Sequence, residues 1–162
     1  MALHEQSVGK SSEWYTPPHV FKAMGAKFDL DTASPGPAIV PWIPANAHIT
    51  YDSLSLSWRG FVWMNPPFGG RNGLEPWLER FSDHPEGVAL TPDRTSAPWW
   101  QRYAPRMDLV LFVSPKIHFI PGPGARASSP AQGTTLMARG LKGKIALMRA
   151  ADAGLGVLMG PA

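Results

Sequence analysis

Apolar residues recur along this chain at two spacings, one typical of helices and the other of strands. Four large apolar side chains at i, i+3, i+4 and i+7, namely Leu74, Trp77, Leu78 and Phe81, predict an amphipathic helix over residues 74–82. Short apolar or alternating runs bounded by turn-forming residues predict strands at 27–31, 61–64, 87–92, 109–113 and 134–138. Because strands and helices alternate, we expect an α/β fold in which helices flank a sheet.

The remaining expected elements are short. Thr16 can cap a helix that has Pro17 in its first turn and ends at Gly25. Three further elements are predicted: a strand at 48–50 within the long loop 38–58, a helix at 97–103 and a return strand at 117–119. The many connecting loops that this pattern requires agree with the 18 prolines and 16 glycines of the sequence.

Length and composition restrict the possible classes of protein. A chain of 162 residues fits one domain, which we expect over residues 13–162 after a flexible polar arm at 1–12. The sequence has no cysteine, which excludes disulfides and thiolate chemistry, and its histidines lack the spacing of metal ligands. No apolar run approaches the ~18 residues of a membrane span, so we expect a soluble, cytoplasmic protein. The net charge of +3 is compatible with a nucleic-acid partner without requiring one.

Polar residues follow three of the predicted strands. Asp31 ends the first, Asn65 follows the second, and Thr91-Pro92-Asp93 stands at the end of the third. In open α/β sheets ligands bind outside the carboxyl ends of the strands. These residues are therefore candidates for one cleft.

The segment Asn65-Pro66-Pro67-Phe68 carries the most specific chemistry. Two consecutive prolines end the strand and fix the backbone, so the Asn65 amide oxygen and the Pro66 carbonyl are two acceptors held close together. They suit an amino group that donates two hydrogen bonds, and the ring of Phe68 can stack on a planar base. The combination is typical of enzymes that methylate the amino group of adenine, cytosine or glutamine.

Several further motifs occur around this segment in a fixed order. They are Trp14, Thr16 and Pro17; Phe28, Leu30, Asp31 and Ala33; Asp52 and Leu54; Trp58, Gly60, Trp63 and Asn65 to Phe68; then Trp77, Trp99 and Trp100. Together they resemble the small phage-type DNA N(6)-adenine methyltransferases, the Dam-like family, over about residues 14–136. The loop 31–37 differs from the commoner glycine-rich cofactor loop, because its one glycine lies between two prolines.

The resemblance implies a Rossmann-like class I methyltransferase fold in one small domain, with S-adenosylmethionine as cofactor and DNA as substrate. It implies that Asn65 and the carbonyl of Pro66 hold the 6-amino group of a flipped adenine, that Pro67 stiffens the site and that Phe68 stacks on the base. The residues expected beside the cofactor are Tyr15, Thr16, Pro17, Asp31, Ala33, Asp52 and Leu54, with Asp52 accepting from the cofactor's adenine amino group.

Contacts to DNA are expected from loops, because the chain has no segment large enough for a separate target-recognition domain. Arg71, Arg94 and Arg126 are the candidates, for phosphate contact rather than base readout. Two alternatives stay open at this point: methylation of a cytosine or protein glutamine amino group, or a DNA-binding relic of the fold without turnover. The resemblance also suggests a phage or restriction-modification setting, in the host cytoplasm if the protein is phage-encoded.

Overall fold

The computed structural model describes residues 14–67, 73–123 and 133–161. Its strands are β1 (Trp14–Tyr15), β2 (Phe28–Asp31), β3 (Ala45–His48), β4 (Val62–Met64), β5 (Gly87–Pro92), β6 (Leu109–Val113), β7 (Ile120–Pro121), β8 (Thr134–Arg139) and β9 (Gly156–Met159). Its helices are α2 (Pro18–Met24), α3 (Glu75–Asp83), α4 (Pro98–Tyr103) and α5 (Gly140–Asp152), with short 3-10 turns at Ser53–Ser55 and Ala104–Arg106.

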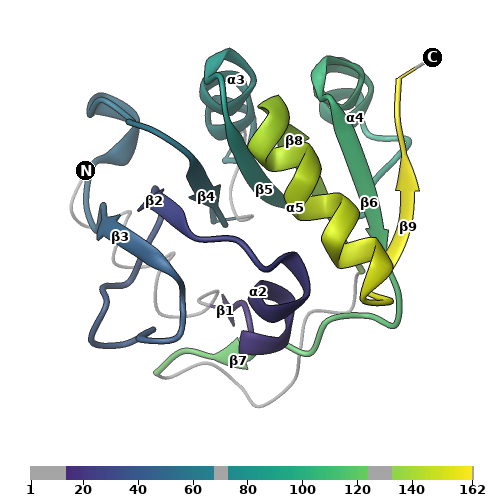
Figure 1. Ribbon diagram of the computed structural model, residues 1–162. Helices are drawn as coiled ribbons and strands as arrows, with labels where there is room; N and C mark the ends of the chain where they lie inside the picture. The colour runs from purple at the N-terminus through teal and green to yellow at the C-terminus, as the bar shows by residue number, and fades with distance from the viewer. Residues whose placement is uncertain (1–13, 68–72, 124–132, 162) are drawn as a thin grey trace.

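The main sheet has seven strands in the order β3-β2-β4-β5-β8-β6-β9 (Figure 1). Strands β3, β2, β4 and β5 are parallel to one another. Strand β8 runs antiparallel to both of its neighbours, β5 and β6, and β9 runs antiparallel to β6. A separate two-stranded sheet joins β1 to β7 in antiparallel register. The result is a mixed sheet flanked by helices, the α/β architecture that the sequence predicts.

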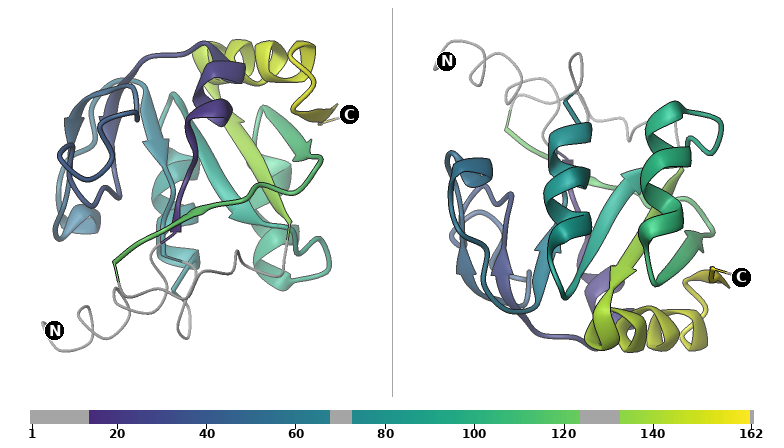
Figure 2. Two further views of the ribbon diagram at one scale, coloured as in Figure 1. Left: turned by 90° about the horizontal axis from the view of Figure 1, so that it is seen from below. Right: turned by 90° about the horizontal axis from the view of Figure 1, so that it is seen from above.

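Helices cover both faces of the main sheet and give a three-layer arrangement (Figures 1 and 2). The buried side chains of α2 and α5 belong to one apolar cluster, and those of α3 and α4 belong to the other. Strand β4 contributes to both clusters, because Trp63 lies in the first while Val62 and Met64 lie in the second. Burial on both faces explains why β4 reads as a continuous apolar run.

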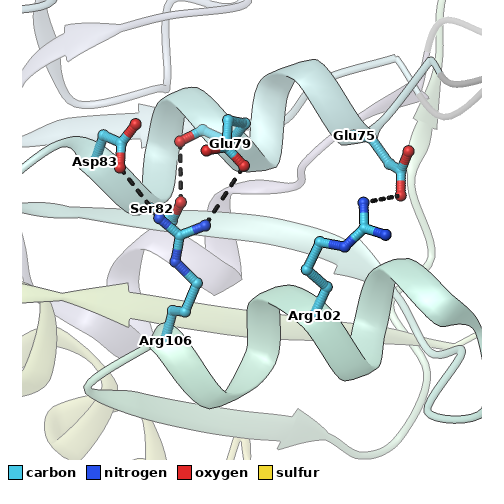
Figure 3. A network of polar contacts seen from close by, with 6 residues as sticks. All are labelled: Glu75, Glu79, Ser82, Asp83, Arg102 and Arg106. Carbon is cyan, nitrogen blue, oxygen red and sulfur yellow. Dashed lines mark hydrogen bonds and ion pairs between the residues drawn. The ribbon is translucent and has the colours of Figure 1, made fainter.

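Helices α3 and α4 lie side by side, and ion pairs at the surface join α3 to α4 and to the 3-10 turn that follows α4 (Figure 3). Arg106 lies 3.4 Å from Glu79 and 3.1 Å from Asp83, and Arg102 lies 3.4 Å from Glu75. Both arginine side chains are at least 40% exposed, so water and salt compete with these pairs. The packing of the two helices therefore depends mainly on their buried apolar side chains.

The central strands agree closely with the sequence predictions. Strands β5 and β6 have the predicted bounds; α4, β2, β4 and β8 differ from theirs by one residue at one end, and α3 by one residue at each end. Helix α5 and strand β9 were not predicted, and glycine is the reason. Gly143 weakens the helical pattern, yet a Cβ there would lie 2.5 Å from the carbonyl oxygen of Gly87. The residue that obscures the helix is thus required for its close approach to the sheet.

Three local predictions were wrong. The strand predicted at 48–50 is observed three residues earlier, as β3. The return strand predicted at 117–119 is observed at β7, whose partner is β1. Helix α2 begins at Pro18 with Pro17 as its N-cap and no side-chain cap, so Thr16 does not cap it. The Thr16 side chain has a different partner, described below.

Candidate active site

The strand order of the main sheet changes direction after β3, because β3 and β4 lie on opposite sides of β2. From β2 the chain passes to β3 on one side and then to β4 on the other, and all three strands are parallel. Asp31, the last residue of β2, is in register with Trp63 of β4, and Asn65 follows β4 directly. The two predicted polar residues therefore lie at adjacent carboxyl ends, at the switch point where α/β sheets place their ligands.

Asp31 is a buried carboxylic acid, with 1% of the residue exposed. Burial raises the pKa of the Asp31 carboxyl from 3.8 to about 6, although hydrogen bonds from the Ala33 backbone and the Ser34 side chain act in the opposite direction. The Ala33 N–H donates to Oδ1 at 3.2 Å. At neutral pH the group is thus mainly ionised in spite of its burial.

His48, at the end of β3, lies beside this carboxylate without pairing strongly with it. Its Nδ1 is 3.8 Å from Asp31 Oδ2 and 2.8 Å from the hydroxyl oxygen of Ser34. Burial lowers the pKa of His48, so the imidazole is neutral at neutral pH. Sequence reasoning missed His48, because its place beside Asp31 depends on the register of β2 and β3, and it did not assign a role to Ser34 in the loop after Asp31. The buried negative charge accordingly has no charged partner in His48.

The proline-flanked loop after Asp31 is fixed by hydrogen bonds to β4 and by one within the loop. Thr32 contacts the carbonyl oxygen of Trp63 twice, through its backbone N–H at 2.9 Å and its hydroxyl at 3.2 Å. The Gly36 N–H donates to the Ser34 hydroxyl at 2.9 Å. Gly36 has a φ of 116°, a conformation that favours glycine. The single glycine of this loop is therefore placed where the backbone needs it.

The amide of Asn65 has a defined orientation. Its Nδ2 donates to the carbonyl oxygen of Trp14 at 3.2 Å and to the hydroxyl oxygen of Thr16 at 3.3 Å. An amide nitrogen has two hydrogens, so these two acceptors use its donor capacity. The amide oxygen Oδ1 is consequently the atom that can serve a substrate. Pro66 next to it is buried, and Pro67 is exposed.

The segment before α2 is held in place from several sides. Trp14 pairs with Pro121 and Tyr15 with Ile120 in the β1–β7 sheet. The indole N–H of Trp42 donates to the carbonyl oxygen of Thr16 at 2.8 Å. Tyr15, Thr16 and Pro17 are all buried. The structure thus brings the first predicted motif into contact with Asn65, 49 residues further along the chain.

Asp52 and Leu54 lie in the loop that follows β3, the strand next to β2. Asp52 is exposed, has a φ of 51°, and its Oδ1 accepts from the Ser55 hydroxyl at 2.9 Å. Arg80 of α3 donates to the carbonyl oxygen of Leu54 at 2.9 Å and also to that of Leu56. The same guanidinium lies 4.8 Å from the centre of the Trp58 ring, and this indole donates to Ser53. Helix α3 therefore holds the loop that carries Asp52.

The remaining predicted residues are dispersed. Arg94 is exposed in the loop after β5. Asp93, which follows the same strand, accepts a hydrogen bond from the Thr135 hydroxyl, while the Thr91 hydroxyl is buried without a partner among the described residues. Phe68, Arg71 and Arg126 lie outside the described residues.

Comparison with known families identifies the class of protein. The family model described as DNA N-6-adenine-methyltransferase (Dam) matches residues 5–151, most of the chain. The chain therefore belongs to the Dam family and is an adenine-specific DNA methyltransferase, a class for which S-adenosylmethionine is the methyl donor. Comparison with curated proteins gives no significant match. Within the described ranges, no helix is long and apolar enough to cross a membrane.

Proposed function

We propose that Asn65 and Pro66 hold the 6-amino group of an adenine that has been flipped out of the DNA, at the switch point between β2 and β4. The observation that carries this proposal is the orientation of the Asn65 amide. Its nitrogen donates to Trp14 and Thr16, which leaves the oxygen to accept. A base inside a duplex cannot reach such an acceptor, so extrusion of the nucleotide is part of the proposal.

Two acceptors at one amino group orient it for methyl transfer. When the Asn65 amide oxygen and the Pro66 carbonyl each accept one amino hydrogen, the nitrogen lone pair is directed out of the plane that contains them. Pro66 and Pro67 fix two backbone φ angles, so this geometry exists before the base arrives. Phe68 follows directly in the sequence, and we propose that its ring stacks on the flipped base.

The residues at the switch point fit a cationic cofactor. S-adenosylmethionine supplies an activated methyl group on a sulfonium and also carries an ammonium group, ribose hydroxyls and an adenine amino group. Asp31 offers a buried carboxylate whose neighbour His48 is neutral, which suits a cationic or hydroxyl donor. The exposed carboxylate of Asp52 suits the adenine amino group, with Leu54 beside it, 37% exposed.

The other predicted cofactor residues surround the same strand ends. Ala33 follows Asp31 and bonds to it through its backbone N–H. Tyr15 and Pro17 flank Thr16 in the buried segment before α2. We propose that these residues shape the cofactor site rather than supply charge. From their charge and their positions in predicted loops we also propose phosphate contacts from Arg71, Arg94 and Arg126. The resemblance alone leads us to propose a phage or restriction-modification setting.

The direct test is methyl transfer followed by product analysis. The protein is incubated with tritiated S-adenosylmethionine and unmethylated DNA, and the digested nucleosides are separated. We expect the label in N6-methyldeoxyadenosine. Label in N4-methyldeoxycytidine, or label only in a glutamine-containing protein substrate, would assign the site to a different amino group. Cofactor binding without any transfer would indicate a relic of the fold.

An exposed-face variant supplies the matched control for this assay. Arg106→Met removes the ion pairs that join α3 to the 3-10 turn after α4, where the Arg106 side chain lies between these two elements and is 40% exposed (Figure 3). Its methyl transfer is expected to equal that of the wild type. Loss of transfer in this variant would show that the assay reports general damage rather than the chemistry of the site.

A further inference from the structure

We propose that Thr16 is a positioning residue, whose hydroxyl holds the Asn65 amide with its oxygen toward the substrate. This inference rests on the proposed function of Asn65. The residues concerned are far apart in the chain but in direct contact, since Asn65 Nδ2 lies 3.3 Å from Thr16 Oγ1 and 3.2 Å from the Trp14 carbonyl oxygen. The sequence suggests a helix cap or a cofactor contact for Thr16, and the geometry points to a third role.

The Thr16 hydroxyl is well placed to hold the Asn65 amide in the orientation that the Trp14 carbonyl selects. Thr16 is 0% exposed, so water does not compete for the hydrogen bond from Asn65. The Thr16 backbone is itself anchored, because its carbonyl accepts from the Trp42 indole at 2.8 Å. Pro17 follows with a φ of −73° as the N-cap of α2. A β-branched side chain on such a backbone has few rotamers.

The orientation matters because the two ends of an amide have opposite hydrogen-bonding character. With Nδ2 toward Thr16 and Trp14, the oxygen accepts from an incoming amino group. Turned by 180°, the amide would present N–H groups to an amino group that must itself donate, and the Asn65 oxygen would face the Trp14 carbonyl. The Trp14 carbonyl, which can only accept, therefore selects the reactive orientation, and the Thr16 hydroxyl adds a second hydrogen bond that holds the amide in it before the base arrives.

The Thr16 hydroxyl is the part of this arrangement that substitution can remove, because the Trp14 acceptor is a backbone carbonyl. Thr16→Val keeps the shape and the β-branch but has no hydroxyl. Thr16→Ser keeps the hydroxyl and loses a methyl group. If valine does not fit the buried position, Thr16→Ala removes the hydroxyl with a smaller side chain. The serine variant is the matched control in either case.

The first readout is the side-chain amide resonance of Asn65 in ¹⁵N-labelled protein without cofactor or DNA, assigned by its disappearance in Asn65→Ala. Thr16→Val is expected to shift this resonance and to speed its hydrogen exchange, and Thr16→Ser is expected to restore both. An unchanged Asn65 resonance in Thr16→Val would overturn the proposal. This readout does not depend on activity, so it decides the role of Thr16 even if the wild type transfers no methyl group.

The second readout separates rate from cofactor affinity. At saturating cofactor, kcat of Thr16→Val is expected to fall about tenfold, the effect of one lost hydrogen bond, while that of Thr16→Ser stays near the wild type. The dissociation constant for S-adenosylmethionine, measured by calorimetry, is expected to change less than about twofold. A raised dissociation constant with an unchanged kcat would instead make Thr16 a cofactor contact and overturn the positioning role.

Discussion

The polar residues at the ends of β2 and β4 and the charged residues between α3 and α4 show two uses of polar contact in one small domain. Between the helices, arginine and carboxylate side chains pair at 3.1–3.4 Å and remain largely exposed (Figure 3). At the strand ends Asp31 is buried, and so is Thr16, the hydrogen-bond partner of Asn65. Solvent competes with the first set and not with the second, so the second can fix atoms in one orientation.

The largest effect is expected for Asn65→Ala, which removes the proposed acceptor. Methyl transfer should fall about 100- to 1000-fold at saturating cofactor, as when one preorganised hydrogen-bonding group is removed from an active site. Cofactor affinity should stay close to that of the wild type, because Asn65 is proposed to contact the base. Single-turnover transfer and calorimetry measure the two quantities. Near-normal transfer would show that Asn65 is not the acceptor.

Asp31 should make cofactor affinity depend on pH. Burial raises the pKa of its carboxyl to about 6, and a cationic ligand binds the ionised form. The dissociation constant should therefore decrease as pH rises toward 6 and level off above it, with proton release detectable in buffers of different ionisation enthalpy. Asp31→Asn should bind more weakly and without this dependence. The same pH profile in Asp31→Asn and wild type would remove Asp31 from the cofactor site.

The stability of the protein without cofactor should show the opposite dependence at Asp31. The folded-state pKa, about 6, lies above the ordinary 3.8, so folding favours the protonated carboxyl. The stabilising contribution of Asp31 to the free energy of unfolding is fully present below about pH 4 and is lost as pH rises through 6. A pKa shift of this size corresponds to about 3 kcal/mol. Urea unfolding of wild type and Asp31→Asn at pH 4 and pH 7 measures it. If the free energy of unfolding of the wild type falls between pH 4 and pH 7 by no more than that of Asp31→Asn, the account is contradicted.

Arg80 is intermediate between the buried contacts at the strand ends and the exposed ion pairs. Its side chain is partly buried, and its guanidinium lies over Trp58 and donates to the Leu54 carbonyl. Arg80→Met keeps the apolar stem and removes these contacts, which should lower the free energy of unfolding by about 1 kcal/mol. The loop that carries Asp52 should loosen, and cofactor affinity should weaken with it. Urea unfolding and calorimetry test both, with Arg80→Lys as the control that retains the charge.

The smallest effect is expected at the exposed ion pairs. Asp83→Asn removes one partner of Arg106, in a pair whose side chains are 40% and 65% exposed. Its free energy of unfolding should change by less than about 0.5 kcal/mol, and the change should shrink in high salt. Unfolding curves at low and high salt test this. If Asp83→Asn lowers the free energy of unfolding by more than about 1 kcal/mol in high salt as well, the exposed ion pairs stabilise the protein as buried contacts do, and the difference between the two regions is not supported.

The sequence predicts those parts of the fold and site that depend on neighbours in the chain. Strands β5 and β6 follow from local apolar runs, and the position of Asn65 at the end of β4 follows from the two adjacent prolines that end the strand. The bond from Asn65 to Thr16 joins residues 49 positions apart, so no local pattern contains it. The contact of His48 with Asp31 likewise depends on the register of β2 and β3.

Helix α5 was not predicted from the sequence for a different reason. Gly143 has poor helix propensity, but its lack of a Cβ lets the helix approach the backbone of Gly87 closely. Tertiary packing thus outweighs local propensity at this position. The prediction that Thr16 caps helix α2 was wrong, because Pro17 is the N-cap residue. The Thr16 hydroxyl accepts from the distant Asn65 instead.

The most direct test of the central claim uses DNA in which one amino group at a time is blocked. DNA is amplified through many cycles with N6-methyl-dATP in place of dATP, or with N4-methyl-dCTP in place of dCTP, so that both strands carry the modified base, and each product is incubated with tritiated S-adenosylmethionine. If Asn65 receives the adenine amino group, the first DNA takes up no label and the second is labelled like unmodified DNA. Uptake by the first and not by the second would contradict the account.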